Sequence, residues 1–340
     1  MKSIVAHAAK DLRIEDHQKP TPKAGQVLIK MAAGGICGSD LHYYNHGGFG
    51  PIQLKEPMIL GHEVSGHIEA LGEDVSRFAQ GDLVAISPSR PCGTCSYCQA
   101  GAQNHCLNMR FYGSAMPFPH IQGAFSEYVV ADVEQCALAN GLSIGEAAMA
   151  EPLSVVLHAA RQAGDLFGKR VLVTGCGPIG LLAVLVARQA GALEIVATDI
   201  ADFTLTKAME VGADQAINVA HQDLSGFHEN KGHFDVLFEC SGVAQALSAA
   251  VPALRPRATI MQLGLGGDMT LPMQAMTAKE LQLKGSFRFH SEFFTAVSMM
   301  QRDRLNVKAL ITQQIPMANA IDAFELASDR TQAVKVNILF

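Results

Sequence analysis

The chain has 340 residues, and at about 150 residues per domain two domains are expected. Hydrophobic residues make up 49% of the chain and charged residues only 17%, which excludes a disordered protein because so apolar a sequence can bury enough surface to fold. The formal net charge of −6 gives no support to a nucleic-acid partner or to binding on an anionic membrane.

We expect neither a targeting segment nor a membrane-spanning segment. Residues 1–5 lack the cationic and apolar regions of a signal peptide. The most apolar stretch, Ile179–Val186, is too short to span a bilayer. We therefore expect a cytoplasmic protein with no membrane partner. In that reducing compartment, clustered cysteines are more often metal ligands or catalytic groups than disulfides.

The first 150 residues are expected to form short strands separated by turns. Gln26–Lys30 and Leu83–Ile86 are two such strands, each following a glycine that marks a turn. The segment Gly34–Gly50 contains six glycines and is predicted to be irregular.

Candidate ligands for one metal are scattered along this region. Cys37 lies in the glycine-rich segment, His62 and Glu63 follow Gly61, and Glu151 comes much later. Adjacent side chains on a strand point in opposite directions, so a site that uses both His62 and Glu63 needs a turn, which Gly61 permits. Three such ligands would leave an open position on a catalytic zinc ion. A surface His-Glu dipeptide and a helix-capping Glu151 are the alternatives.

Four cysteines with close spacing predict a second metal site. The pattern is Cys92-x₂-Cys95-x₂-Cys98-x₇-Cys106, in a polar segment with no lysine or arginine from Pro91 to Asn108. Four thiolates form a closed tetrahedral site, which is typical of structural zinc. An iron–sulfur cluster shares this ligation and is the alternative. A zinc module for nucleic acid is disfavoured because it needs basic residues nearby.

From Lys169 onward, strands alternate with helices, which predicts a parallel sheet wound on both faces. The expected strands are Val171–Thr174, Glu194–Thr198, Phe234–Phe238 and Ala258–Leu263, and the expected helices are Pro178–Gln189, Leu205–Val211 and Val243–Leu254.

A glycine fingerprint lies between the first strand and helix of this region. Gly175-Cys176-Gly177-Pro178-Ile179-Gly180 has the G-x-G-x-x-G spacing of a dinucleotide-binding loop, and Asp199 follows the last glycine by 19 residues at the end of the next strand. Asp199 would bind the ribose hydroxyls and repel a 2′-phosphate. No lysine or arginine lies between Ile200 and Thr206, so NAD is favoured over NADP. A purely structural helix N-terminus is the alternative.

Residues after the later strands are further candidates for cofactor contacts, because ligands bind at strand carboxyl ends in such sheets. They are Cys240, Gly264 and Ser286. The alternation stops after Phe287, where a helix over Ser291–Arg302 and a strand over Ala333–Phe340 are expected. We assign this tail to the first domain. The expected domains are therefore 1–150 together with 288–340, and 151–287.

These motifs occur in an order that resembles the zinc-dependent medium-chain dehydrogenases, in particular their sorbitol dehydrogenase branch. The resemblance is carried by Gly61-His62-Glu63, the cysteine cluster, Glu151-Pro152-Leu153 and the glycine fingerprint. A further similarity, to members of that branch that oxidise aldonates, is carried by residues 34–44, 109–116 and 285–289.

The resemblance implies an α/β fold: a β-rich GroES-like catalytic domain joined to a doubly wound Rossmann domain, with the active site between them. It implies two zinc ions per chain. The catalytic one would be bound by Cys37, His62 and Glu63, with Glu151 binding it directly or through a water molecule. It also implies a proton relay through Ser39 and His42. Thr204 departs from the family, many members of which have a basic residue there, so some NADP use stays open.

The resemblance further implies a sugar-acid or polyol substrate. An aldonate needs a partner for its carboxylate, which suits the planar fork of arginine. Arg110, Arg288 and His120 are the candidates, and Tyr43 is placed near the substrate hydroxyls. Ordinary salt-bridge arginines are the alternative. A neutral polyol substrate and a non-catalytic NAD-binding zinc scaffold stay open as functions. A homo-oligomer, tetramer or dimer, is expected from the family.

Overall fold

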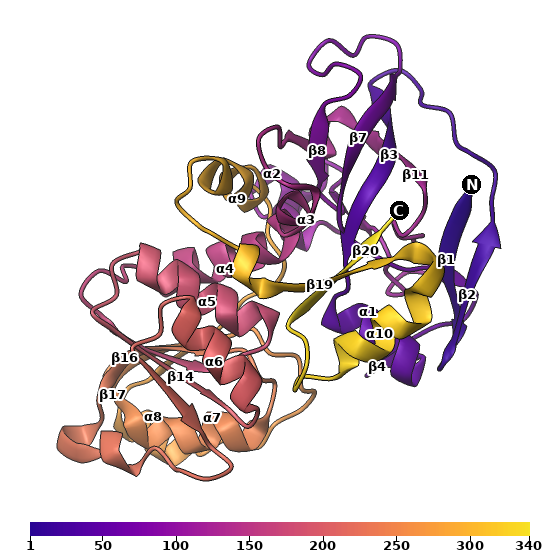
Figure 1. The fold of residues 1–340 in the computed structure, drawn as a ribbon. Coiled ribbons are helices and arrows are strands. Elements are labelled where there is room, and N and C mark those ends of the chain that lie inside the picture. Colours follow the sequence, from indigo (N-terminus) through magenta and orange to yellow (C-terminus); the bar gives the residue numbers. More distant parts are fainter.

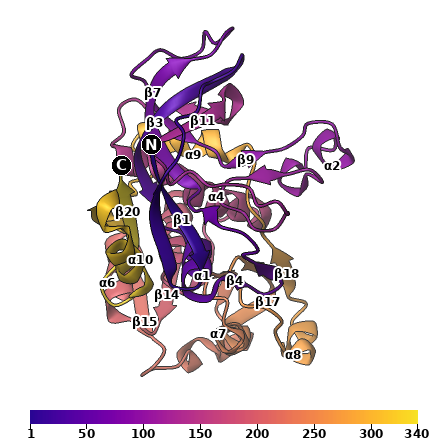
Figure 2. The ribbon, with the colours of Figure 1, turned by 90° about the vertical axis from the view of Figure 1, so that its right-hand side faces the viewer.

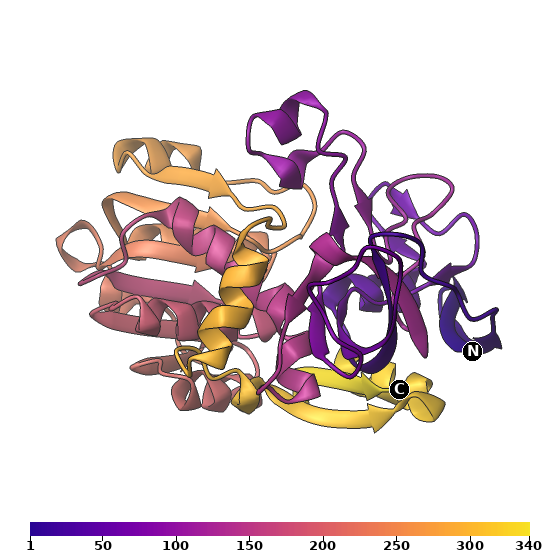
Figure 3. The ribbon, with the colours of Figure 1, turned by 90° about the horizontal axis from the view of Figure 1, so that it is seen from above.

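The computed structural model describes all residues, 1–340, and forms two lobes with a sheet at the centre of each (Figure 1). Figure 3 shows the lobes side by side, with α9 (Glu292–Gln301) lying between them. No helix has both the length and the apolar character needed to cross a membrane.

The N-terminal lobe is built on a seven-stranded sheet with the order β12-β8-β7-β3-β20-β19, in which β11 also pairs with β3. The strands are β3 Gln26–Gly35, β7 Glu63–Leu71, β8 Leu83–Ile86, β11 Tyr128–Asp132, β12 Cys136–Leu138, β19 Ile311–Pro316 and β20 Lys335–Leu339. The remaining strands form three small sheets: β1 Lys2–Ala8, β2 Asp11–Asp16 and β6 Met58–Ile59; β4 Gly48–Phe49 and β5 Ile52–Gln53; β9 Ser89–Arg90 and β10 Arg110–Phe111.

The second lobe contains a six-stranded sheet with the order β15-β14-β13-β16-β17-β18, in which every pair is parallel. The strands are β13 Arg170–Thr174, β14 Glu194–Asp199, β15 Gln215–Asn218, β16 Phe234–Glu239, β17 Leu254–Gln262 and β18 Gln282–Gly285. Val171 and Val173 of β13 belong to one apolar core and Leu172 to another, as the period of a strand buried on both faces requires.

Helices cover both faces of this sheet. α4 (Ala150–Ala163), α5 (Pro178–Gln189), α6 (Asp202–Glu210) and α9 contribute to the core on one side. α7 (Ala244–Ala250) and α8 (Met273–Ala278) contribute to the core on the other. The predicted doubly wound parallel sheet is thus confirmed, and each strand and helix expected between residues 171 and 263 is present. The largest differences are that α7 ends at Ala250, before the expected Leu254, and that β17 begins at Leu254, before the expected Ala258.

The C-terminal segment contacts both lobes. β20 pairs with β3, and β19 pairs with β20, so the last strands complete the N-terminal sheet. α10 (Ala320–Ser328) lies beside α1 (Gly38–His46), where Figure 1 shows the two helices together. α9, by contrast, shares its core with α4 and α5. The domain limits placed at residues 150/151 and 287/288 stay predictions.

The expectation of an irregular segment over Gly34–Gly50 was wrong, because α1 occupies Gly38–His46. Local capping explains the helix. Asp40 accepts a hydrogen bond from the Cys37 N–H (3.0 Å) through its Oδ2, and Gly47 ends the helix in the left-handed conformation with φ 73°. The two remaining α-helices are α2 (Ser96–Gln99), which projects from the lobe in Figure 2, and α3 (Ile144–Ala148).

Candidate active site and metal centres

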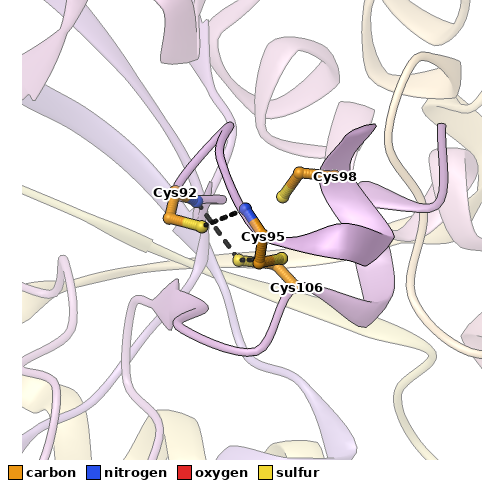
Figure 4. Close-up of side chains that lie close together, drawn as sticks. All are labelled: Cys92, Cys95, Cys98 and Cys106. Carbon is orange, nitrogen blue, oxygen red and sulfur yellow. Dashed lines mark hydrogen bonds between the residues drawn. The ribbon is translucent and has the colours of Figure 1, made fainter. Parts of the chain in front are cut away.

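The cysteine loop brings four thiol groups together. The Sγ atoms of Cys92, Cys95, Cys98 and Cys106 all lie within 4.8 Å of one another, and Figure 4 shows them converging from the loop around α2. Backbone N–H groups donate to these sulfurs: Cys92 N lies 3.2 Å from Cys106 Sγ, and Cys95 N lies 3.4 Å from Cys92 Sγ. Hydrogen bonds, first that from the Thr94 N–H, lower the pKa of Cys92 to about 5.

This donor set fits a structural zinc ion. Four sulfur atoms this close together can bind one tetrahedral zinc ion. The lowered pKa of Cys92 favours the thiolate, which is the form that binds the metal. The loop has little apolar core of its own, since Tyr97 and Leu107 are exposed. A bound metal would therefore fix its conformation.

A second cluster lies where β3 ends and β7 begins. The ligand atoms of Cys37, His62 and Glu63 lie within 4.8 Å of one another. Gly61 has φ 92°, a left-handed turn directly before His62, so both His62 and Glu63 reach the same cluster. A Cβ at Gly61 would also overlap the ring of Phe125, which explains why glycine stands there.

The chemistry of the second cluster fits a metal ion. His62 Nδ1 is buried and has no hydrogen-bond partner; its nearest carboxylate oxygen, Asp40 Oδ1, is 3.7 Å away. Burial, together with the negative charge of Glu63, raises the pKa of Cys37 to about 12. A half-buried thiol, an unpartnered imidazole nitrogen and a carboxylate are suitable zinc ligands, and a cation would favour the thiolate.

Two residues that sequence reasoning missed hold this cluster in place. Lys335 Nζ donates to Glu63 Oε2 (2.5 Å) and to the Ile36 carbonyl (3.0 Å). Asp40 accepts from the N–H groups of Cys37 and Gly61. The single lysine within the apolar run from Ala333 to Val336 was the available signal for Lys335. Its partner, however, is 272 residues away.

Glu151 lies in the first turn of α4, close enough to His62, Glu63 and Cys37 to be influenced by their charges. Burial is the main reason that its pKa rises to about 8. It is not among the residues whose ligand atoms lie within 4.8 Å of one another. The choice between Glu63 and Glu151 as the direct ligand therefore stays a prediction.

Ser39 and His42 both lie on α1, three residues apart and hence on one face. Ser39 is half-buried directly after the Cys37 turn, whereas His42 is exposed. Partial burial, and then the positive charges of His46 and Arg330, lower the pKa of His42. The ring is therefore neutral at pH 7.

Of the four substrate candidates, the structure brings Tyr43 and Arg288 to the cluster. The Arg288 Cζ atom lies 4.2 Å from the centroid of the Phe111 ring. Its positive charge opposes the rise that burial causes in the pKa of Tyr43. Burial lowers the pKa of Arg288 to about 10, and the charge of Glu151 opposes that shift. Tyr43 is buried, and its hydroxyl accepts from the Ala115 N–H (3.1 Å), which leaves its own proton free to donate.

The other two candidates are placed differently. Arg110 is exposed on β10 and forms no ion pair or side-chain hydrogen bond. His120 is buried, and both ring nitrogens are used within the chain: Nε2 lies 2.9 Å from the Lys55 N–H, and Nδ1 lies 2.9 Å from the Pro117 carbonyl. That ring has no free group for a substrate in this arrangement.

The glycine loop has the geometry that a dinucleotide requires. Gly175 has φ 83° and lies against Ser241, and a Cβ at Gly180 would overlap the Gly175 carbonyl. Pro178 and Ile179 begin α5, with Gly177 as its N-cap. Asp199 accepts from the Cys176 N–H (2.6 Å), so the acidic residue also fixes the loop.

Cys240, Gly264 and Ser286 follow the carboxyl ends of β16, β17 and β18. The Ser286 hydroxyl is buried without a partner, as is Gln262 Oε1, so a ligand at this edge would find unsatisfied polar atoms. Glu239, which sequence reasoning missed, is completely buried and accepts from the N–H groups of Ser241 and Gly242. It connects the turns that follow β16 and β17, since its Oε2 also accepts from Gln262 (2.6 Å).

The chain is similar to proteins of known family along its whole length. Residues 23–141 match the model of the alcohol dehydrogenase GroES-like domain, and residues 178–302 match that of the zinc-binding dehydrogenases. The chain is 43% identical to L-idonate 5-dehydrogenase (NAD(P)(+)) of Escherichia coli, over 92% of each chain. It is 36% identical to bovine sorbitol dehydrogenase, over 99% of this chain and 95% of the relative.

A solved structure gives the same result for the fold. The crystal structure of L-idonate 5-dehydrogenase from Escherichia coli K-12 matches with a TM-score of 0.93 at 41% identity, covering 100% of this chain and 98% of that chain. The GroES-like and Rossmann parts expected from the sequence are confirmed by these matches.

Proposed function

The chain belongs to the zinc-binding alcohol dehydrogenases of the medium-chain dehydrogenase family, and we propose that it transfers hydride between a nicotinamide dinucleotide and a secondary alcohol of L-idonate. The product of oxidation would be 5-keto-D-gluconate. The relative named L-idonate 5-dehydrogenase supports this substrate, and a neutral polyol is the second candidate because the sorbitol dehydrogenases are also relatives.

Arg288 is the single observation that carries the choice of a sugar acid. Its guanidinium is half-buried beside the candidate zinc cluster, and its only hydrogen-bond partner is the Met116 sulfur, at 3.5 Å. No carboxylate of the chain forms an ion pair with it, so its charge is left for a ligand. Arg288 also has φ 55°, a left-handed conformation that is unusual for a residue with a side chain and is often found at functional sites.

Cys37 and His62, with a carboxylate from Glu63 or Glu151, would hold the catalytic zinc ion, and the four-cysteine loop would hold the second. When bound, the catalytic ion supplies a Lewis acid for the reacting hydroxyl. The glycine loop and the carboxyl ends of β16–β18 would form the binding edge for the dinucleotide, which would supply the hydride acceptor. Glu63, fixed by Lys335, keeps the cluster in its folded arrangement.

The chain's own residues would carry the proton. Oxidation of the alcohol releases one hydride and one proton, and the hydroxyl of Ser39, two residues after Cys37, would receive that proton. His42, one turn further and exposed, would accept it and release it to water. Its lowered pKa keeps the ring in the accepting form at pH 7. The Tyr43 hydroxyl would donate a hydrogen bond to a substrate oxygen.

We expect NAD as the preferred dinucleotide, with NADP also used. Asp199, the last residue of β14, would bind the ribose hydroxyls. The relative's name includes both dinucleotides, and that relative supports dual use. Thr204 is buried and donates to the Ala201 carbonyl (2.9 Å), so its hydroxyl is used within the chain. The tetramer or dimer and the cytoplasmic location stay predictions.

A substrate panel tests the proposed reaction. NADH and NADPH formation would be measured with L-idonate, sorbitol, L-threonine and gluconate side by side, on protein with its zinc content determined. The highest kcat/KM is expected with L-idonate and NAD. A higher value with sorbitol would favour the polyol alternative, and no turnover with any alcohol, with one zinc ion per chain, would favour a scaffold.

The substrate contact is tested by R288M with R110M as its matched control. Loss of a charge-assisted hydrogen bond costs about 1.5–3 kcal/mol, so R288M should lower kcat/KM for L-idonate by about 10- to 100-fold. Activity with sorbitol should change little, and R110M should leave both substrates unaffected. Equal losses of R288M on both substrates would refute carboxylate binding by Arg288.

A further inference from the structure

Arg330 belongs to the N-terminal lobe but contacts the glycine loop of the parallel-sheet lobe. It lies in the turn between α10 and β20, whereas Gly177 is the N-cap of α5 in the parallel-sheet lobe. A Cβ built on Gly177 would overlap Arg330 Nη1 and lie 3.5 Å from its Cζ. The guanidinium therefore lies directly over the glycine at which the cofactor's phosphates would approach the backbone.

The turn that carries Arg330 is fixed by its neighbours and not by Arg330 itself. Asp329 accepts hydrogen bonds from the N–H and hydroxyl of Thr331 and from the Gln332 side chain. Arg330 is exposed and forms no ion pair or side-chain hydrogen bond. The carboxylate of Asp329 is thus already hydrogen-bonded to Thr331 and Gln332, and the guanidinium of Arg330 has no partner.

The surroundings of Arg330 are positive. The N-terminus of α5, a helix of 12 residues, carries unpaired N–H groups and the positive end of the helix dipole. After burial, interaction with His46 and with Arg330 lowers the pKa of His42, so the Arg330 charge also reaches the exposed face of α1. Asp199, the acidic residue of this edge, already accepts from the N–H groups of Cys176, Ile200 and Ala201.

A guanidinium at a helix N-terminus is electrostatically unfavourable unless an anion lies between them. We propose that Arg330 binds the pyrophosphate of the dinucleotide, so that the lobe completed by β19 and β20 contributes a phosphate ligand to the cofactor held by the other lobe. The planar, always charged guanidinium suits two phosphate oxygens. This proposal rests on the dinucleotide part of the proposed function and not on the identity of the alcohol.

Direct binding measurements test the proposal without turnover. Dissociation constants of NADH would be measured by fluorescence, and those of ADP-ribose and adenosine by calorimetry, for the wild type, R330M, R330K and R302M. Arg302 follows α9, is exposed and has no ion pair, so R302M is the matched control. R330M should raise the dissociation constants of NADH and ADP-ribose by about 10- to 100-fold. R330K should have an intermediate effect, and R302M should bind both ligands as the wild type does.

Adenosine separates a phosphate contact from a structural effect, because it lacks the pyrophosphate. Its affinity should be the same in R330M and in the wild type. Unchanged ADP-ribose binding by R330M, or equal loss of adenosine and ADP-ribose, would overturn the assignment. If the wild type binds NADH but does not oxidise L-idonate, the proposed substrate is wrong. The ratios of the R330M and wild-type dissociation constants still test the role of Arg330. A wild type that binds no dinucleotide would overturn both.

Discussion

Lys335 and Glu63 form an ion pair with side chains that are only 1% and 2% exposed. Removing two charges from water costs several kcal/mol each, and the pair is tolerated only where geometry and further hydrogen bonds compensate. The additional bond from Lys335 to the Ile36 carbonyl provides such compensation. Burial opposes the charge on Lys335, yet the attraction of Glu63 raises the pKa of this lysine above its usual value. The lysine therefore stays charged.

Replacing only the lysine should leave a buried carboxylate without its partner. We expect K335M to lower the free energy of unfolding by about 3–5 kcal/mol, measured by urea denaturation. K308M is the control, because Lys308 is 68% exposed and lies 3.7 Å from Glu146. K308M should lower the free energy of unfolding by less than about 1 kcal/mol. Similar losses in the two variants would contradict a stabilising role for the buried pair.

The lowered pKa of His42 leads to a prediction for the pH profile. As pH falls through that pKa, below the usual 6.5, the ring becomes protonated and can no longer accept the substrate's proton. Oxidation should therefore keep its kcat/KM from pH 8 to about 6.5 and lose it below, because the free enzyme's pKa sets the acidic limb.

Two variants test this assignment. H42Q should remove the acidic limb and slow oxidation, with partial rescue by added imidazole buffer. H46Q should keep the limb but move it to higher pH, because removal of the positive charge of His46 favours protonation of His42. An unchanged profile in H42Q would show that His42 is not the proton acceptor.

At the scale of elements, the alternating strands and helices of the second lobe were predictable because each carries its own periodic pattern. α1 was not. It lies in a glycine-rich segment, and its own serine, aspartate, histidines, tyrosines and asparagine are weak helix formers. The helix exists because Asp40 and Gly47 cap it and because Tyr43 and Tyr44 pack into the core.

The metal-binding residues were predictable for a similar reason: the cysteines are close in sequence, and the resemblance connected the dispersed ligands. Lys335 and Arg330 were not predicted, because their partners are 272 and 153 positions away. The pairing of β20 with β3 brings Lys335 to Glu63, and only the packing of the two lobes brings Arg330 to Gly177. Glu239 likewise looked like the end of a buried strand. Its role depends on turns that follow two neighbouring strands.

The cysteine loop should behave as a separate metal-dependent element. C98A removes one of four thiolates and should lower the zinc content from two ions per chain to one, measured by elemental analysis of the purified protein. C136A is the matched control, because Cys136 is buried in the core of the N-terminal lobe away from both clusters. It should keep both ions. Two ions in C98A would contradict the structural site.

At the scale of the whole molecule, the lobes are joined by a continuous apolar core. Leu83 and Ala85 of β8 belong to the same buried cluster as Val171 and Val173 of β13. α9 packs into that cluster with Phe293 and Ala296. Because unfolding of either lobe would expose this shared surface to water, the two lobes should unfold together.

The aromatic residues allow this cooperativity to be measured. The chain has no tryptophan, and its five tyrosines all lie between residues 43 and 128, so tyrosine fluorescence reports on the N-terminal lobe alone. Circular dichroism at 222 nm reports on helices of both lobes. The two urea transitions should coincide, and NADH at 100 times its dissociation constant should raise the unfolding free energy from both probes by about 2.7 kcal/mol. A shift seen by circular dichroism but not by fluorescence would mean that the lobes unfold independently and that Arg330 does not couple them through the cofactor.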